Sequence, residues 1–318
     1  MIIALAPMEG LTTVYYRRAL ARWFGGVDRY FTPFLTPTQD HRFTKRELRE
    51  VLPEQNGGLP TVPQLLTRNA EDFLWAAGEL TAMGYREVNL NLGCPSGTVV
   101  AKGKGSGFLA HPAELDAFLE EIFSKAPCAI SVKTRIGLKD PEEFPALLAI
   151  YRKYPVAELI VHPRVRTDMY KNTPRWDCFG TALENSPFPV CYNGDICTPD
   201  DAARLQAAFP AAERLMLGRG LAGDPALARR LKGGPSAGRA ELNCFVEQVY
   251  ESYAEAFGSR RNAMLRMKEV WFYLIRLFQD GDKLSKAIKK ARDPLDYEGA
   301  VRAVFADLEL SPVLIPNW

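Results

Sequence analysis

Eight short apolar runs, each long enough for a buried strand, recur along the first two thirds of the chain. They cover residues 2–6, 30–34, 61–66, 87–92, 129–134, 158–162, 189–193 and 214–217. Their intervals are mostly near 30 residues, and helix-like stretches lie between most of them. Strands that alternate with helices are typical of parallel βα units, and eight such units close into a barrel. The pattern therefore predicts an α/β fold, a (β/α)8 TIM barrel.

An open, doubly wound sheet is the structural alternative. That fold binds nucleotides through a Gly-x-Gly-x-x-Gly turn after the first strand, and no such turn follows residues 2–6. Helix start signals agree with βα units. Thr12 or Thr13 is a candidate cap for a helix that ends at Gly25-Gly26, Asn69 for one that ends at Gly84, and Thr198 precedes Pro199 and two acidic residues.

A different pattern begins after the glycine-rich stretch 232–238, which we interpret as a linker. Beyond it no strand is indicated, and apolar residues recur with helical spacing. The helical stretches are 241–257, 262–278, 283–292 and 296–308. We therefore predict two domains, a barrel over residues 1–235 and a small all-α helical bundle over residues 239–318.

The composition is that of an ordinary globular enzyme, with 47% hydrophobic and 25% charged residues and a net charge of +2. Any nucleic-acid surface must therefore be a local patch. The six cysteines form no Cys-x-x-Cys pair and no zinc spacing, so no metal is expected. With no signal-like start and no apolar run that could span a bilayer, we expect a cytoplasmic protein with reduced thiols and no membrane partner.

One strand end stands out, the stretch from Glu87 to Pro95. Asn89 and Asn91 lie two apart, so on a strand they point to the same side, where two buried amides need partners. Cys94 follows a glycine that lets the backbone turn and precedes a proline that stiffens the exit. A buried, inert cysteine is the ordinary interpretation of a lone Cys, but the amide pair and the turn favour a functional site.

Polar residues also occupy most of the other strand ends. The carboxyl ends of the predicted strands carry Met8 and Glu9, Gln64, Asn91 and Cys94, Lys133 and Arg135, His162 and Arg164, Asn193 and Asp195, and Arg219. In a barrel these ends converge on one rim, where functional groups are found. A single polar strand end is usually a satisfied core group, whereas so many on one rim indicate a ligand.

The last two ends have the character of a phosphate site. Asn193-Gly194-Asp195 and Gly218-Arg219-Gly220 offer accessible backbone N–H groups and one guanidinium, and loops after strands seven and eight commonly hold phosphate in this fold. Gly103–Gly107 lacks the Gly-Lys-Ser/Thr ending of a phosphate loop. We interpret it as a flexible loop over the site, with Lys102 or Lys104 near a polyanion. Lys133 and His162 suit a ligand with carbonyls and developing negative charge.

These pieces, in their order, resemble the tRNA-dihydrouridine synthases, a family of flavin enzymes with a barrel and a helical C-terminal domain. The matching segments are Ala6–Gly10, Gln64-Leu65, Asn91–Pro95, Lys133–Gly137, His162-x-Arg164, Asn193–Ile196 and Gly218–Gly220. The chain departs from the family pattern at Asn89, where Asp is usual, at Pro163, where Gly is usual, and at Val165, where Thr is common.

The resemblance implies an oxidoreductase that binds FMN and uses NADPH or NADH to reduce a uridine of tRNA. It implies flavin contacts from Pro7, Met8, Gln64, Lys133 and His162, and phosphate contacts from Asn193, Gly194, Asp195, Gly218 and Arg219. The hydride goes to C6 of a flipped-out uracil, and Cys94 is expected to be the acid that protonates C5, since a thiol with a pKa of about 8.5 is mostly protonated at neutral pH. Asn91 is expected to orient the base, and Arg164 to lie near the uracil or the RNA backbone.

The helical region supports an RNA substrate. Between Ser259 and Arg292 ten basic residues stand against three acidic ones, and Lys283, Lys286 and Lys290 share one helical face. We expect Lys286 and Lys290 to contact tRNA, although a merely solvated helix surface is the alternative. The aromatic residues Trp271, Phe272, Tyr273 and Phe278 are expected in the bundle core.

Two other functions remain open. One is a flavin barrel that reduces a free pyrimidine or enone, and the other is an RNA-binding or folding factor without turnover. We expect a monomer, although no motif determines the oligomeric state, the choice between NADPH and NADH, or the uridine position that is reduced.

Overall fold

The computed structural model describes residues 1–316, so the last two residues of the predicted 239–318 domain lie outside the described part. Its strands are β1 (Ile2–Leu5), β2 (Arg29–Phe31), β3 (Thr61–Val62), β4 (Gln64–Leu65), β5 (Glu87–Leu92), β6 (Ala129–Arg135), β7 (Leu159–His162), β8 (Val190–Tyr192) and β9 (Arg214–Leu217). They fall on the eight apolar runs of the sequence.

The helices follow most of the strands. Up to β9 they are α1 (Val14–Trp23), α2 (Lys45–Val51), α3 (Pro53–Asn56), α4 (Ala70–Ala82), α5 (Gly97–Val100), η1 (Gly105–Ala110), α6 (Pro112–Lys125), η2 (Pro141–Glu143), α7 (Phe144–Tyr151), η3 (Arg166–Asp168), α8 (Trp176–Asn185) and α9 (Pro199–Ala208). Beyond β9 they are α10 (Arg219–Gly223), α11 (Leu227–Leu231), α12 (Arg239–Phe257), α13 (Arg260–Leu274), η4 (Ile275–Leu277), α14 (Asp282–Lys290) and α15 (Pro294–Asp307).

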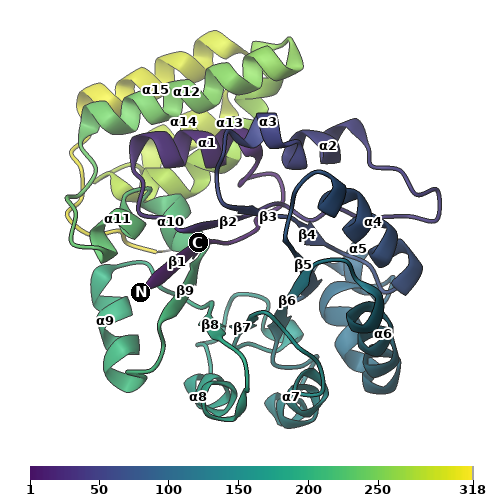
Figure 1. Cartoon of the computed structure of the whole chain (residues 1–318). Helices are drawn as coiled ribbons and strands as arrows, with labels where there is room; N and C mark the ends of the chain where they lie inside the picture. The colour runs from purple at the N-terminus through teal and green to yellow at the C-terminus, as the bar shows by residue number, and fades with distance from the viewer. Residues whose placement is uncertain (317–318) are drawn as a thin grey trace. The chain divides into compact units, whose positions relative to one another are not determined.

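The strands form one parallel sheet, and its two edge strands are neighbours in the sequence. The order is β3-β2-β1-β9-β8-β7-β6-β5-β4, and β3 and β4 are separated only by Pro63. Proline has no N–H for the ladder, but its carbonyl still accepts from Asn89 N at 2.8 Å, while Val62 O accepts from Thr32 N at 3.1 Å. One proline-interrupted strand therefore joins both edges. The eight predicted strands and the barrel are confirmed, and Figure 1 shows them as a ring with α4, α6, α7 and α8 outside it.

The chain divides into two compact units. The first comprises Met1–Pro7, Arg29–Gly194 and Leu205–Met216, and holds most of the sheet. The second comprises Met8–Asp28, Asp195–Arg204 and the chain from Leu217 onward. Both units thus contain segments from well separated parts of the chain.

Apolar side chains from the strands form a buried core cluster. It consists of Ala4, Ala6, Phe31, Val62, Ile160, Cys191 and Met216. At the amino ends of the strands Glu158, which is 3% exposed, binds Arg29 at 2.6 Å and Arg214 at 3.1 Å, and Arg29 also binds Glu87 at 2.6 Å. A buried carboxylate is tolerated only with such partners. These ion pairs connect four strands at the end of the barrel opposite the predicted site.

The structure confirms two of the predicted helix caps. Asn69 accepts from Asp72 N at 2.9 Å at the start of α4, and Thr198 accepts from Asp201 N at 3.1 Å at the start of α9. Thr13 is the residue before α1, but its side chain forms no cap and instead lies 2.7 Å from Tyr253 OH. Thr12 bonds to Met8 instead, donating from its hydroxyl to Met8 O at 3.3 Å.

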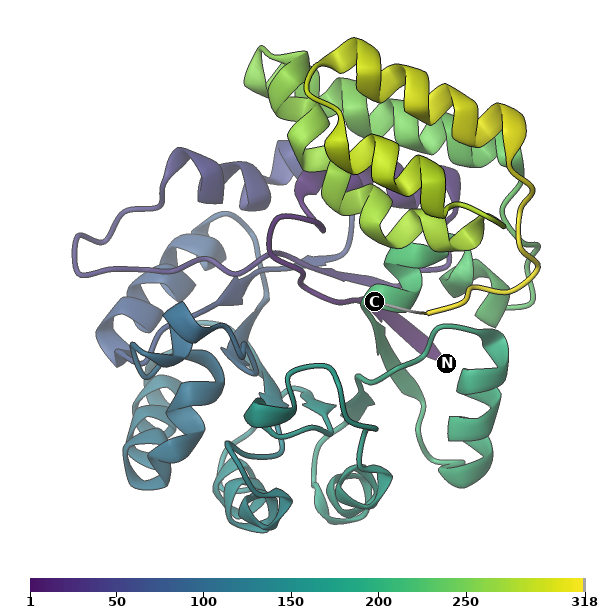
Figure 2. The same cartoon turned by 180° about the vertical axis from the view of Figure 1, so that it is seen from behind.

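Helices α12 to α15 pack together in the second unit, as predicted, and Figure 2 shows them side by side. Helix α1 packs on α12, where Trp23 donates to Gln248 Oε1 at 2.8 Å and Tyr16 meets Phe245 edge to face at 5.4 Å. Trp271 and Phe278 are buried in this unit. Phe272 is 49% exposed, so its predicted place in the core is wrong, because it lies on the face of α13 opposite to Trp271 and Leu274.

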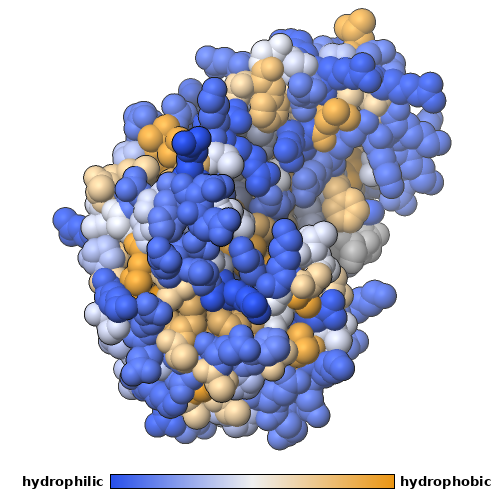
Figure 3. All heavy atoms as spheres, turned by 90° about the vertical axis from the view of Figure 1, so that its right-hand side faces the viewer, coloured by the Kyte–Doolittle hydropathy of each residue, from blue (hydrophilic) through white to orange (hydrophobic). Residues whose placement is uncertain are grey.

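The visible surface is largely hydrophilic, with hydrophobic side chains in small groups among polar ones (Figure 3). Among residues 1–316, no helix is both long and apolar enough to cross a membrane.

Candidate active site

The carboxyl ends of the strands in the first unit bring together six of the predicted site residues. Gln64 lies on β4, Asn91 on β5, Lys133 on β6 and His162 on β7, while Cys94 and Asn193 directly follow β5 and β8. Asn91 is in register with Lys133, and Lys133 with Ile160, so the side chains come from adjacent strands. Parallel strands end at the same edge, which places these groups on one rim.

A chain of buried amides leads to the reactive loop. Gln64 donates to Asn89 Oδ1 at 2.8 Å, Asn89 donates to Ser131 Oγ at 2.9 Å, and Asn91 donates to Gln64 Oε1 at 2.8 Å. Asn91 Oδ1 then accepts from the backbone N–H of Gly93 at 3.0 Å and Cys94 at 2.9 Å. The amide pair of β5 therefore does not need a ligand to satisfy it. It fixes the turn that carries the thiol.

The Gly103–Gly107 stretch holds the same turn from the other side. Ser106 is fully buried and donates from both its backbone N–H, at 3.1 Å, and its hydroxyl, at 2.8 Å, to the carbonyl of Cys94. Gly105 has φ +57, and a Cβ there would lie 2.9 Å from that carbonyl oxygen. The predicted flexible loop is wrong. The glycines instead let a buried 3-10 turn, η1, approach Cys94 closely.

The Cys94 side chain is half-buried and forms no disulfide. The pKa of Lys133 is lowered to about 8, chiefly by burial and also by the Arg135 cation, while the nearby thiols of Cys191 and Cys94 act in the opposite direction. Lys133 and Cys94 therefore interact electrostatically, which brings two predicted site residues together.

His162 and Arg164 form a pair after β7. His162 Nε2 lies 3.1 Å from Arg164 NH1, and both residues are buried. A guanidinium only donates, so Nε2 must accept, and the imidazole is neutral with its proton on Nδ1. Arg164 also donates from Nε to the carbonyl of Asn172. Its guanidinium, predicted to contact RNA, is 1% exposed in this structure and directs the histidine tautomer.

Arg135 was placed at a strand end by the sequence pattern, but the pattern gave it no role. It is 1% exposed and donates to three carbonyls, those of Gly93 at 3.0 Å, Val165 at 3.0 Å and Met169 at 2.8 Å. Its guanidinium also lies 5.3 Å from the ring of Tyr170. One side chain thus joins the Cys94 turn to the loop after β7.

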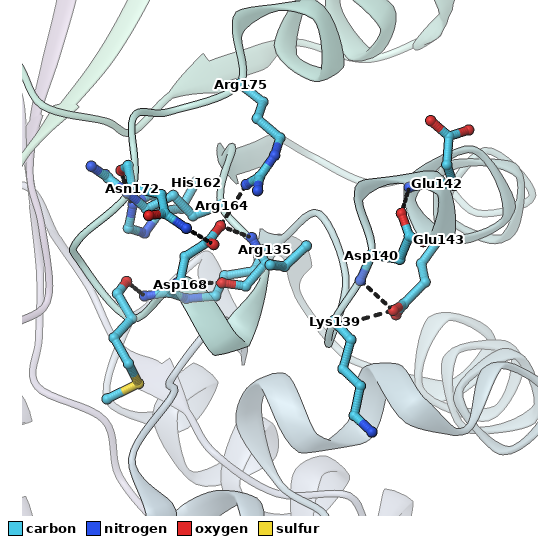
Figure 4. A network of polar contacts seen from close by, with 12 residues as sticks. Arg135, Lys139, Asp140, Glu142, Glu143, His162, Arg164, Asp168, Asn172 and Arg175 are labelled. Carbon is cyan, nitrogen blue, oxygen red and sulfur yellow. Dashed lines mark hydrogen bonds and ion pairs between the residues drawn. The ribbon is translucent and has the colours of Figure 1, made fainter.

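Asp168 organises that loop from within, and it was not predicted (Figure 4). Its carboxylate accepts from Val165 N at 3.1 Å, from Arg175 NH1 at 2.5 Å and from Asn172 Nδ2 at 2.5 Å. Burial alone would raise the pKa of Asp168, but Arg175, Asn172 and the backbone N–H outweigh it and lower the pKa. Asp168 follows Val165 by three residues and accepts from its N–H, in the manner of the acidic residue of a capping box.

The predicted phosphate site is divided between the units, with Asn193 and Gly194 in the first and Asp195, Gly218 and Arg219 in the second. In the first, Asn193 donates to Met216 O at 2.8 Å, and a Cβ on Gly194 would lie 2.1 Å from Tyr192 OH, so only glycine fits. In the second, Arg219 binds Asp195 at 2.6 Å, and a Cβ on Gly220 would lie 2.1 Å from the carbonyl oxygen of Ile196. Arg219 thus lies beside a carboxylate, which offsets part of its positive charge.

Pro7 and Met8, which follow β1, are both partly exposed. Met8 N donates to Thr12 Oγ1 at 2.8 Å, and Met8 O accepts from Leu11 N and Thr12 N at 3.1 and 3.0 Å. This compact turn holds the Met8 backbone in the second unit.

The basic face of α14 is exposed. Lys283, Lys286 and Lys290 point away from the buried Ile288, as expected from their spacing. Other basic residues between Ser259 and Arg292 have partners. Arg260 binds Glu251 and Glu298, each at 2.7 Å, and Lys268 donates to the carbonyls of Lys289 and Ala291 at the end of α14.

Solved structures with a similar fold include a variant of NCR from Zymomonas mobilis and morphinone reductase. The first has a TM-score of 0.51 at 15% identity and covers 76% of this chain and 90% of its own. The second has a TM-score of 0.50 at 12% identity and covers 75% and 87%. Together with the ring of strands, they define the chain as a parallel βα barrel with its polar groups at the carboxyl ends.

The sequence identifies the family. The sequence model of the dihydrouridine synthases (Dus) matches residues 4–299. A tRNA-dihydrouridine(16) synthase of Ralstonia nicotianae is 27% identical over 96% of both chains, and one of Pseudomonas putida is 33% identical over 71% of this chain and 72% of its own. A probable tRNA-dihydrouridine synthase 2 of Bacillus subtilis is 30% identical over 70% and 69%. The chain belongs to the dihydrouridine synthase family, as the sequence motifs indicated.

Proposed function

We propose that this enzyme reduces a uridine of tRNA to 5,6-dihydrouridine, with FMN reduced by NADPH and Cys94 as the acid. The observation that carries the proposal is the turn after β5, where Asn91 and Ser106 hold the backbone of Cys94 from two sides at a rim that also bears Lys133. A half-buried thiol held this firmly suits a group that must deliver a proton to one atom.

The donors at this rim fit a flavin. The isoalloxazine presents carbonyl oxygens and ring nitrogens that accept hydrogen bonds, and reduction adds negative charge to it. Lys133 supplies an ammonium, and His162, with its proton on Nδ1, supplies a neutral donor. Pro7, Met8 and Gln64 would complete the flavin site, and Asn193, Gly194, Asp195, Gly218 and Arg219 would hold the phosphate. Bound FMN would supply the hydride for C6 of the uracil.

The chain's own residues would do the rest. Cys94 would give its Sγ proton to C5, leaving a thiolate beside the Lys133 cation. Asn91 would place the flipped base while its carbonyl oxygen keeps the Cys94 turn in position. Arg164 would act near the uracil through the neighbouring His162. NADH is the alternative reductant.

For the substrate, we infer that Lys286 and Lys290 on α14 contact the tRNA backbone, and that residues 1–235 and 239–318 act as catalytic and tRNA-binding domains. Several relatives are named for position 16 of tRNA, so uridine 16 is the first position to test. A cytoplasmic, monomeric enzyme is part of the same proposal.

The test is product formation by the purified protein. We expect it to be yellow and to convert uridine to dihydrouridine in tRNA lacking the modification, measured by mass spectrometry with NADPH as reductant. Cys94→Ala should keep flavin and tRNA binding but lose most product, at least about 100-fold. Cys178→Ala, a buried cysteine on α8, is the control and should remain active.

Three outcomes would contradict the proposal. Turnover by Cys94→Ala equal to that of the parent would remove the thiol from the acid role. Reduction of free uracil or an enone with no effect on tRNA would favour a small-molecule reductase, and a colourless protein that binds RNA without turnover would favour a binding factor.

A further inference from the structure

A depression on the first unit lies outside the groups considered above. Its volume is about 460 Å³, and it is lined by Arg68, Lys102, Gly103, Gly107 and His111 together with short aliphatic side chains. Arg68, Lys102 and His111 are exposed, so the depression faces solvent. Among its described lining residues there is no carboxylate and no Phe, Tyr or Trp ring.

The charge of the depression is positive. Lys104, in the same turn, has a pKa lowered by burial and by the cations of Lys102 and Arg68, with Asp72 acting against them. Two further carboxylates lie beside lining residues, Glu114 at 3.7 Å from His111 Nδ1 and Glu143, which accepts from Leu138 N at 2.8 Å. Arg68 and Lys102 line the depression itself, whereas these carboxylates are not among its lining residues. Cations that line a depression with no acid among the lining residues are typical of an anion site.

The backbone of the turn comes close to this surface. A Cβ on Gly103 would lie 2.6 Å from Arg68 NH1, and one on Gly107 would lie 2.9 Å from Val100 O. Because Gly103 has no side chain, the Arg68 guanidinium can lie against the main chain. A ligand that enters the depression therefore meets both the cations and the glycine backbone.

The same turn braces the reactive cysteine. Residues 100–103 and Gly107 line the depression, while Ser106 and Gly105 of the same segment contact the carbonyl of Cys94. Binding in the depression and the position of the thiol are therefore mechanically connected through one short segment.

We propose that this depression binds a backbone phosphodiester of the RNA substrate close to the nucleotide that is reduced. The inference rests on the proposed function, since RNA is the anion. A phosphodiester matches a site with cations and glycine backbone, where no Phe, Tyr or Trp ring offers a stacking surface for a base. The site adds a phosphate contact on the catalytic unit, separate from the basic face of α14.

The experiment compares the parent with an Arg68→Gln, Lys102→Gln double variant. Both side chains are exposed, so the fold should be kept, and thermal unfolding checks this. The affinity for tRNA, measured by fluorescence anisotropy over a series of salt concentrations, should fall about tenfold at low salt. The slope of log K against log salt should become shallower by about 0.9 for the lost phosphate.

The matched control removes the same charge elsewhere on the first unit. Lys125, the last residue of α6, and Lys153, which follows α7, are exposed, so Lys125→Gln with Lys153→Gln should leave the slope unchanged. The phosphate could come from RNA or from NADPH, and reduction of the flavin by NADPH without RNA distinguishes the two. The rate of this reduction should be the same in the parent and in the Arg68→Gln, Lys102→Gln variant.

An unchanged salt slope in that variant would overturn this site while leaving the proposed function intact. Weaker NADPH binding with an unchanged slope would also overturn it, by assigning the depression to the dinucleotide. A parent protein that binds no tRNA would refute the proposed function and this site together.

Discussion

At the scale of single residues, the polar strand ends fall into two groups. Gln64, Asn89 and Asn91 use their amides mainly on one another, and Arg135 uses its guanidinium on three carbonyls. These residues hold loops in place. Lys133 and His162 are instead placed to offer charge or a proton donor at the rim, which is what a ligand requires.

Lys133 gives a pH test at this scale. With a pKa of about 8, it is half charged near that pH in the protein without ligand. A flavin that favours the ammonium raises this pKa when it binds, so at pH above about 8 binding requires proton uptake. FMN affinity should therefore weaken as the pH rises through about 8, by up to about tenfold per pH unit.

The measurement is quenching of flavin fluorescence between neutral and alkaline pH. Lys133→Met keeps the length of the side chain but cannot titrate, and should bind FMN more weakly with an affinity that is flat in this window. If parent and variant follow the same pH curve, Lys133 does not contact the flavin.

At the scale of elements, the unexpected one is η1. A glycine-rich stretch without strand or helix periodicity is usually a mobile loop, yet here Gly105 to Leu109 are buried. The stretch is buried because Ser106 and Gly105 pack on the Cys94 carbonyl. The hydrogen bond from Ser106 to that carbonyl joins residues 12 positions apart. Local sequence statistics cannot detect it.

Gly105→Ala tests this brace. The substitution places an L-residue at φ +57 and a Cβ 2.9 Å from both the Cys94 carbonyl oxygen and Val99 Cγ1. We expect a loss of stability of about 2 kcal/mol or more, from the left-handed backbone and the overlap together, and product formation that falls more than flavin binding.

Gly258→Ala is the matched control. Gly258 has nearly the same backbone, φ +58, but a Cβ there meets nothing within 4 Å. It should lose only the backbone part, about 1 kcal/mol, with product formation retained. Equal effects of the two substitutions on turnover would show that the contact with Cys94 does not matter. Thermal unfolding and dihydrouridine assays give both readouts.

At the scale of the whole molecule, charge is distributed unevenly. The chain carries a net charge of +2, while Lys283, Lys286 and Lys290 gather on one exposed face of α14. Phosphate contacts are strongly salt-dependent, so such a face should dominate the electrostatic part of RNA binding.

Reversal of two charges tests that face. Lys286→Glu with Lys290→Glu should weaken tRNA binding by about 100-fold at low salt and flatten its salt dependence by about two phosphates. The control, Lys125→Glu with Lys153→Glu, changes the net charge equally on α6 and after α7. If the α14 charge reversal does not change tRNA binding, the basic face of α14 is only a solvated surface. Electrophoretic mobility and anisotropy assays measure both.

The sequence alone determined the strands, the order of the βα units, most helix caps and the identity of the strand-end residues. These depend on local periodicity, on short-range capping and on the rule that parallel strands share an edge. Only the tertiary structure decided which of the polar groups are occupied in holding loops. That distinction depends on partners distant in the chain, such as Gly93 and Met169 for Arg135 or Ser106 for Cys94, and no local pattern records such contacts.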